Sequence, residues 1–250
     1  MKARTIALLV TAAFAAGATG LAQAQAKISG DVVKIGVLTD LSGLYSDIVG
    51  QGSVLAAQMR ILINTGAAST RLTNEDCTPY TIHHTYDTFA LANGTGKAVV
   101  KQGGDTWFFL TADYAFGHSL EKDTGDVVKA NGGKVVGAVR HPLNTSDFSS
   151  FLLQAQSSKA KIVGLANAGG DTIKAANEFG ITKNQSLAGL LVFITDVHSL
   201  GLAATQNMYV TEAWYWDLND DTRRWSKRFF EKHKKMPSMV HAGVYSGTMM

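Results

Sequence analysis

The sequence predicts an α/β fold built on parallel strands, and two features of the chain support this prediction. Short apolar runs alternate with amphipathic stretches, and the connections between them are brief. Strands and helices that alternate with short connections are typical of a parallel sheet covered by helices on both faces. The apolar runs that we expect to form strands are 33–38, 61–64, 106–110, 134–139, 161–165, 187–193 and 208–211.

The first 26 residues have the three-part pattern of a secretory signal peptide. Lys2 and Arg4 precede an apolar run over residues 6–16, and small residues follow, with cleavage expected near Ala24 or Ala26. The apolar run is well short of the ~20 residues that a helix needs to span a bilayer. We therefore expect the chain to be exported and the signal to be removed.

The charge balance excludes one large class of partner. Removing residues 1–26 leaves 21 of the 23 basic residues against 20 acidic ones. A nearly neutral chain is a poor ligand for nucleic acid, so we expect no nucleic-acid partner. The remaining residues suffice for two small α/β lobes. Cys77 is the single cysteine, so no intramolecular disulfide is expected.

A loop of small and polar residues follows the expected first strand and includes Ser42, Gly43 and Tyr45. In an open parallel sheet, ligands bind outside the carboxyl ends of the strands, near helix N-termini. Unpaired N–H groups and partial positive charge at those N-termini suit a carboxylate. The same composition also fits an ordinary turn between strand and helix, and the loop alone leaves both interpretations open.

Amphipathic stretches behind the later strands predict helices over residues 114–128, 148–155 and 173–179. The second follows Asp147, in an N-cap region, and the third ends at Gly180, a typical C-terminal stop. These helices are the expected cover of the sheet.

Three sequence features could indicate a metal site, a phosphate-binding loop or a basic interaction surface, but none of them has the full pattern. His83 and His84 are adjacent in an expected strand, so they point to opposite faces and do not form a joint metal site. The sequence GTGKAV at 94–99 lacks the first glycine of a phosphate-binding loop and predicts a weak point within a helix. The basic run 223–235 is interrupted by aromatic residues at helical spacing, which indicates a solvated face with a core stripe. Contact of this run with a membrane partner is the alternative.

One junction does not fit the α/β pattern. The stretch GSVLAAQMRILINTG, at 52–66, passes from helix to strand with no connecting residues. Connections of this kind normally contain two to six residues. Either the helix frays there, or the chain lacks a segment at this place.

The chain resembles the leucine/isoleucine/valine-type periplasmic binding proteins, the solute receptors of ABC importers. The resemblance lies, in the family's order, in the stretches KIGVLTDLSGLYSDIVGQGSVLAAQM, ILINTGAASTRLT, DFSSFLLQAQ, GLANAGGDT and GLLVFITDVHSLGL. It implies a two-lobe periplasmic-binding-protein type I architecture, a periplasmic location and a small amino acid or related carboxylate as ligand. It also implies membrane permease subunits as partners.

The resemblance further implies a domain organisation and an incomplete first lobe. It implies that a segment of the family is missing between about Met59 and Arg60, and that the chain stops at Met250, inside an expected helix. The implied parts are a signal peptide at 1–26, an incomplete first lobe at 27–105, a second lobe at 106–211 and a return to the first lobe at 212–250. Cys77 is then either orphaned by the missing segment or a lone buried thiol.

The ligand residues are implied residue by residue. The loop after the first strand offers Ser42 and Tyr45, and the loop GAAST offers Ala68 and Ser69 to a carboxylate. Tyr114 matches a cleft aromatic. The complete set implied by the resemblance is Ser42, Tyr45, Ala68, Ser69, Tyr114, Asn167, Asp196 and Tyr245.

Some members of this set have a second interpretation. Asn167 follows a strand and is expected to hydrogen-bond the ligand. Asp196 is expected either to pair with a ligand ammonium group or to be the N-cap of a short helix. Tyr245, with His241 one turn earlier, is expected either to line the pocket or to pack helices together.

Two other functions compete with the receptor. An exported α/β hydrolase is one, although the sequence contains no G-x-S-x-G or H-E-x-x-H motif and its cysteine has no expected base partner. A deletion product with impaired folding and binding is the other, because lost strands leave sheet edges open. In the receptor interpretation we expect no catalytic residue, no metal and no cofactor.

Overall fold

The structure, a computed structural model, describes residues 62–168 and 170–250. The described residues belong to one compact unit. The predictions for the signal peptide, the first strand, the junction before Ile61, Ser42 and Tyr45 fall outside the described residues.

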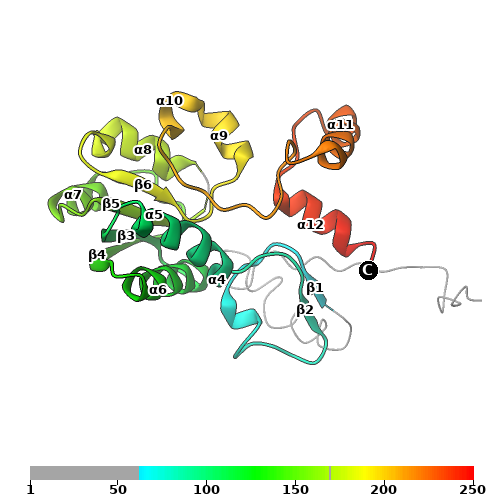
Figure 1. The fold of residues 1–250 in the computed structure, drawn as a ribbon, viewed down its shortest axis with the longest axis horizontal. Coiled ribbons are helices and arrows are strands. Elements are labelled where there is room, and N and C mark those ends of the chain that lie inside the picture. Colours follow the sequence, from blue (N-terminus) through cyan, green and yellow to red (C-terminus); the bar gives the residue numbers. More distant parts are fainter. Residues whose placement is uncertain (1–61, 169) are drawn as a thin grey trace, which may run out of the picture. The chain divides into compact units, whose positions relative to one another are not determined.

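The main sheet has four parallel strands in the order β4-β3-β5-β6 (Figure 1). Its strands are β3 (Thr106–Ala112), β4 (Lys134–His141), β5 (Ile162–Ala166) and β6 (Ser186–Gly189). All four match expected apolar runs, and the predicted parallel sheet is confirmed. Two details of the prediction were wrong. β6 ends at Gly189, so Leu190 and Leu191 are buried in a loop, and run 208–211 makes only one bridge, between Tyr209 and Ala188.

Helices cover both faces of this sheet, because β3 buries alternate side chains on opposite sides. Trp107 and Phe109 pack in one cluster with residues of α4, α5 and α6, whereas Phe108 and Leu110 pack in another with residues of α7 and α8. The helices are α4 (Thr88–Leu91), α5 (Lys97–Lys101), α6 (Ala115–Ala130), α7 (Ser149–Ser157) and α8 (Asp171–Phe179).

The ends and irregularities of these helices follow from their sequences. α8 stops at Gly180, whose φ of 82° is left-handed, as the sequence predicts. The expected weak point at GTGKAV is a π-helical turn, η2 (Ala92–Gly96), between α4 and α5. Gly94 is needed there, because a Cβ at this position would collide with the Thr211 side chain.

A second, two-stranded parallel sheet pairs Leu62 with Thr81. It consists of β1 (Leu62–Asn64) and β2 (Thr81–His83), with the 3-10 turn η1 (Thr70–Leu72) in the connection. α12 (Met239–Gly247) lies against the segment after β2, where His84 Nε2 is 2.8 Å from Ser246 Oγ. The remaining elements are η3 (Ile181–Lys183), α9 (Ile194–Leu200), α10 (Leu202–Thr205) and α11 (Asp220–His233).

The two adjacent histidines have separate partners, although only His83 lies in β2 and His84 follows the strand. His83 Nδ1 lies 2.7 Å from Thr73 Oγ1, while His84 contacts Ser246. Within residues 62–168 and 170–250, no group of His, Cys, Asp and Glu is arranged to hold a metal ion. In the same ranges no helix has both the length and the apolar character to cross a membrane.

The packing of β3 predicts a large cost for losing one ring. Phe109 is fully buried, so Phe109→Ala should lower the free energy of unfolding by about 3–5 kcal/mol. Phe89 is 61% exposed on α4, and Phe89→Ala should change it by less than about 0.5 kcal/mol. Urea denaturation of both variants measures this. Similar losses in the two variants would contradict the described core.

Candidate functional site

The loop after β1 is shaped by the Asn64 side chain. Its Oδ1 atom accepts hydrogen bonds from the backbone N–H groups of Gly66, at 3.2 Å, and Ala67, at 2.9 Å. Small residues at 66–68 therefore allow a tight turn, but these two amides already have an acceptor. A side chain of the same loop thus takes two amides that small residues would otherwise leave open to a ligand.

The segment that leads from β2 into α4 holds the loop by hydrogen bonds to its backbone carbonyl groups. Thr85 Oγ1 donates to the carbonyl oxygen of Thr65 at 3.1 Å, and the Tyr86 hydroxyl donates to that of Gly66 at 3.3 Å. The backbone N–H of Thr88 donates to the carbonyl of Ala68 at 2.8 Å. Three carbonyls of one loop are thus bound by residues 85–88, which fixes the loop relative to the start of α4.

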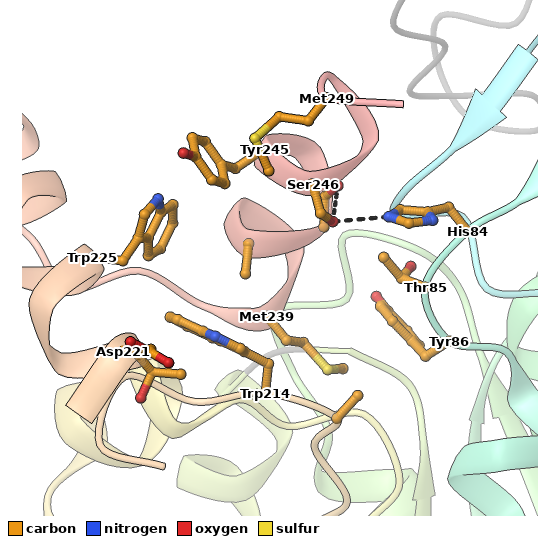
Figure 2. Close-up of a pocket in the computed structure, with 14 residues that line it drawn as sticks. His84, Thr85, Tyr86, Trp214, Asp221, Trp225, Met239, Tyr245, Ser246 and Met249 are labelled. Atoms are coloured by element: carbon orange, nitrogen blue, oxygen red, sulfur yellow. Dashed lines mark hydrogen bonds between the residues drawn. The ribbon is translucent and has the colours of Figure 1, made fainter. Parts of the chain in front are cut away.

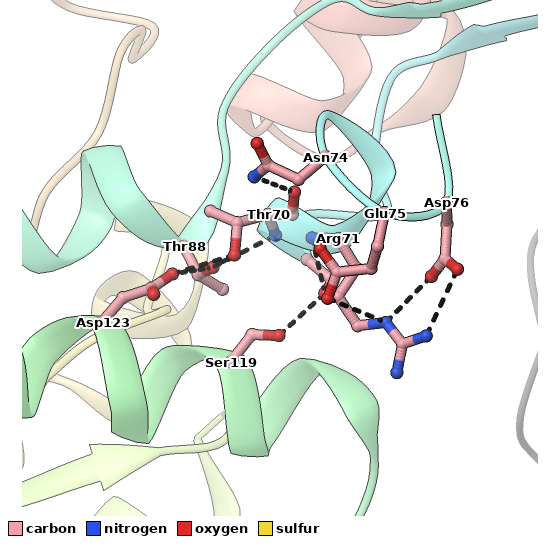
Figure 3. A network of polar contacts seen from close by, with 9 residues as sticks. Thr70, Arg71, Asn74, Glu75, Asp76, Thr88, Ser119 and Asp123 are labelled. Carbon is pink, nitrogen blue, oxygen red and sulfur yellow. Dashed lines mark hydrogen bonds and ion pairs between the residues drawn. The ribbon is translucent and has the colours of Figure 1, made fainter. Parts of the chain in front are cut away.

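The same loop reaches the first turns of α6. Ala68 is only 3% exposed and belongs to the buried cluster that contains Tyr86 and Phe116. Ser69 Oγ lies 2.8 Å from Ser119 Oγ of α6 (Figure 3). Ser69 and the N-terminal half of α6, which are 50 positions apart in sequence, are therefore direct neighbours.

Tyr114 occupies the N-cap position of α6 and contributes to the same region. It is half-buried, packs against the cluster that holds Ala68, and its ring centroid lies 5.8 Å from that of Phe116. Burial, with a smaller effect of Tyr114, raises the pKa of Tyr86 to about 12. The Tyr86 hydroxyl therefore stays protonated near neutral pH and can keep donating to Gly66. The structure brings Ala68, Ser69 and Tyr114 together.

Asn167 lies at the carboxyl end of β5 but turns its amide toward protein groups. It is 4% exposed, and Nδ2 donates to Thr172 Oγ1 at 2.9 Å and lies 3.3 Å from His141 Nε2. These contacts join the ends of β4 and β5 to the first turn of α8. In this arrangement the Asn167 side chain braces the rim of the sheet, and its expected role toward a ligand stays a prediction.

Asp196 is the third residue of α9, and its carboxylate caps that helix. Oδ2 accepts the backbone N–H of Phe193 at 2.9 Å. The interpretation of Asp196 as the N-cap residue was wrong, because Phe193 holds that position, but the Asp196 side chain does cap the helix from its third residue. Helix capping leaves other lone pairs on the carboxylate, so pairing with a ligand ammonium stays a prediction.

Glu212 is a titratable neighbour of Asp196 that the sequence analysis missed. Burial raises its pKa to about 7, the backbone N–H of Ile194 lowers it, and the Asp196 carboxylate raises it further. Glu212 Oε1 is buried without a hydrogen-bond partner within the described residues. The signal available in the sequence was a single acid within the apolar run MYVTEAWYW.

Tyr245 lies at a different hollow, a cavity of about 500 Å³ (Figure 2). The cavity is lined by the segment after β2, α12 and the start of α11, and the ring centroids of Tyr245 and Trp225 are 5.3 Å apart. Of the predicted site residues within the described ranges, this cavity includes Tyr245 alone. Tyr86 and Met239 line it and also belong to the cluster around Ala68, so the two regions share a wall.

Two further predictions concern His241 and Cys77. His241 Nδ1 accepts the backbone N–H of Ser238 at 3.0 Å, which caps α12, and burial lowers its pKa. Its ring centroid also lies 5.1 Å from that of Phe229. Helix packing accounts for these contacts. Cys77 is exposed, so the interpretation as a buried thiol was wrong.

The raised pKa of Glu212 predicts that the protein loses stability as the pH rises from about 4.5 to about 7. The unfolded carboxyl ionises near 4.5 and the folded one near 7, so the free energy of unfolding should fall as the pH rises through this window. Glu212→Gln removes this term. Because Glu212 keeps some contact with solvent, the variant should gain about 1–2 kcal/mol at pH 8.

Urea denaturation between pH 4.5 and 8 measures the difference between this variant and the natural protein. Glu231→Gln, at an exposed position on α11, is the matched control and should follow the natural protein at every pH. Parallel pH profiles for Glu212→Gln and the natural protein would show that the Glu212 carboxyl is not buried as described.

Comparison with known proteins identifies the family. A profile described as periplasmic binding protein matches residues 60–250. A crystal structure of a periplasmic binding protein from Burkholderia mallei is 51% identical, with a TM-score of 0.77, and the match covers 87% of this chain and 76% of that one. No curated protein sequence matches the chain significantly.

Two further structures extend the comparison. A branched-chain amino acid ABC transporter periplasmic ligand-binding protein from Burkholderia xenovorans LB400 is 33% identical, with a TM-score of 0.66, and covers 78% of this chain. An amino acid ABC transporter substrate-binding protein from Pseudomonas fluorescens Pf-5, at 19% identity and a TM-score of 0.71 over 82% of this chain, shares the fold. The matches span 53% and 57% of those two chains. The chain belongs to the periplasmic binding protein family of ABC transporters.

Proposed function

We propose that the protein is the receptor of an ABC importer and that it binds a small carboxylate-bearing solute where the loop after β1 meets the start of α6. The observation that supports this most is the meeting of Ala68 and Ser69 with Tyr114 and Ser119, from elements distant in sequence. Small-molecule sites of this fold class form at such strand ends, where loops from different elements converge.

The chemistry of this place suits an anion. α6 has 16 residues, and its N-terminal N–H groups carry partial positive charge. Tyr114 at the N-cap position has no short side-chain oxygen to satisfy these groups, unlike the Ser or Asp usual there. Ser69 adds a hydroxyl donor, and the ring of Tyr114 adds apolar surface. A carboxylate would thus exchange water for several fixed donors.

The ligand class is proposed as carboxylates, with amino acids and aromatic acids both included. The relative from Burkholderia xenovorans is described as a branched-chain amino acid transporter protein. Proteins of the same fold from Rhodopseudomonas palustris were solved with benzoate and with p-hydroxybenzoate, at 21% and 20% identity, which shows the fold alone. The Asp196 carboxylate already accepts the backbone N–H of Phe193. It therefore has a hydrogen-bond partner without a ligand ammonium group, and the proposed ligand class includes carboxylates that lack one.

Location and partners follow from the same proposal. The signal-peptide pattern at residues 1–26 supports export to the periplasm, with cleavage near Ala24 or Ala26. There the loaded receptor would dock on the permease subunits of its importer. A binding role needs no catalytic group, and we propose none.

Ligand binding should be measurable as stabilisation of the exported protein. A set of leucine-like amino acids, short-chain organic acids and benzoates should contain at least one compound that raises the melting temperature. Ser69→Ala should raise the Kd of that compound about tenfold, because one hydrogen bond to a charged group is lost. Ser150→Ala, exposed on α7, should leave it unchanged.

Three results would count against the receptor. If no carboxylate in the set raised the melting temperature, the proposed ligand class would be wrong. Esterase or amidase turnover that disappears in Ser69→Ala would favour the hydrolase instead. A broad, non-cooperative melt would favour a deletion product with impaired folding, whereas the extensive core around β3 leads us to expect a cooperative one.

A further inference from the structure

Two residues of α6 hold the loop that carries Ser69. Ser119 and Asp123 are four positions apart, so they lie on one face of the helix. Ser119 contacts Ser69, and Asp123 Oδ2 accepts the Thr70 hydroxyl at 3.1 Å and the Thr88 hydroxyl at 2.6 Å (Figure 3). One carboxylate oxygen thus joins the loop after β1, the first residue of α4 and the middle of α6.

The contact between Asp123 and Thr88 has the features of a strong hydrogen bond. A hydroxyl that donates to a carboxylate at 2.5–2.7 Å is charge-assisted, and Thr88 is fully buried, which reduces competition from water. Thr88 makes three further contacts with the loop: its Oγ1 accepts the Thr70 N–H at 3.3 Å and lies 3.3 Å from Thr70 Oγ1, and its N–H donates to Ala68. Removing the carboxylate would deprive the Thr70 hydroxyl of its acceptor on α6 and leave the Thr88 hydroxyl with Thr70 as its acceptor.

The contact between Ser69 and Ser119 determines where the Ser69 hydrogen can point. Each hydroxyl has one hydrogen to donate. If Ser69 donates to Ser119, it has none left for a ligand. If Ser119 donates to Ser69, the Ser69 hydrogen is available to a carboxylate, which only accepts. A bound carboxylate would therefore select the chain Ser119 to Ser69 to ligand, whose members strengthen one another.

We propose that Ser119 and Asp123 are positioning residues for ligand binding: Ser119 directs the Ser69 hydroxyl, and Asp123 holds the loop at the start of α6 through Thr70 and Thr88. This inference rests on the proposed carboxylate site. Neither residue needs to touch the ligand. Both act through the loop, which they hold in position before the ligand binds.

The test compares two acidic residues of the same helix in the full-length protein. Asp123→Ala should raise the Kd of the best-stabilising carboxylate about tenfold or more. In this variant part of the binding free energy would be used to order the loosened loop. Asp126→Ala is the matched control. Asp126 is exposed and pairs only locally with Lys122, at 2.9 Å, so its loss should change the Kd less than twofold.

Hydrogen exchange supplies a readout that needs no ligand. In Asp123→Ala, amides of residues 66–74 should exchange about tenfold faster, while amides of β3 and β5 keep their protection. Should Asp123→Ala fail to fold, Thr70→Val, which removes the loop hydroxyl at nearly constant volume, should give the same changes at smaller size. Ser119→Ala should raise the Kd about threefold without faster exchange of β3.

The outcomes separate this inference from the proposed function. If the natural protein binds no carboxylate but Asp123→Ala loosens residues 66–74, the carboxylate site is wrong and the positioning of the loop stands. If the natural protein binds and Asp123→Ala matches Asp126→Ala in both Kd and exchange, the site stands and the positioning role is overturned. Faster exchange throughout the main sheet in Asp123→Ala would show that Asp123 stabilises the whole fold. That result would also overturn the positioning role.

Discussion

The fastening of the loop after β1 is the constraint on which the candidate site depends. Carbonyl groups of Thr65, Gly66 and Ala68 are bound by residues 85–88, and two amides are bound by Asn64. With these backbone groups bound within the protein, the loop has a defined position and places the Ser69 hydroxyl next to Ser119 of α6. A loose loop of this composition would lose considerable conformational entropy on binding a ligand, which would weaken the affinity.

The main sheet supplies the other half of the site by placing α6. Trp107 and Phe109 on β3 pack against α6, and Gly117 lets the first turn lie on the carbonyl oxygens of Ala112 and Ala166, where any Cβ would collide. The N-terminus of α6 is therefore set against the ends of β3 and β5. The core that stabilises the fold also aims this helix end at the loop after β1.

The sequence predicted the elements of the fold better than the contacts of the site. Period and apolar runs located β3, β4 and β5, because these depend on local pattern and burial. The shortening of β6 and the exact capping position of Asp196 were set by neighbours that the pattern does not reveal. Glu212 was missed for the same reason, since its burial depends on packing near Ile194. Ser42 and Tyr45 stay predictions.

A crystal structure of the protein with its best-stabilising carboxylate tests the central claim most directly. The account predicts that the ligand's carboxylate lies within hydrogen-bonding distance of Ser69 Oγ and the first amides of α6, next to the Tyr114 ring. A ligand seated instead in the cavity beside Trp225 and Tyr245, with Ser69 untouched, would contradict it.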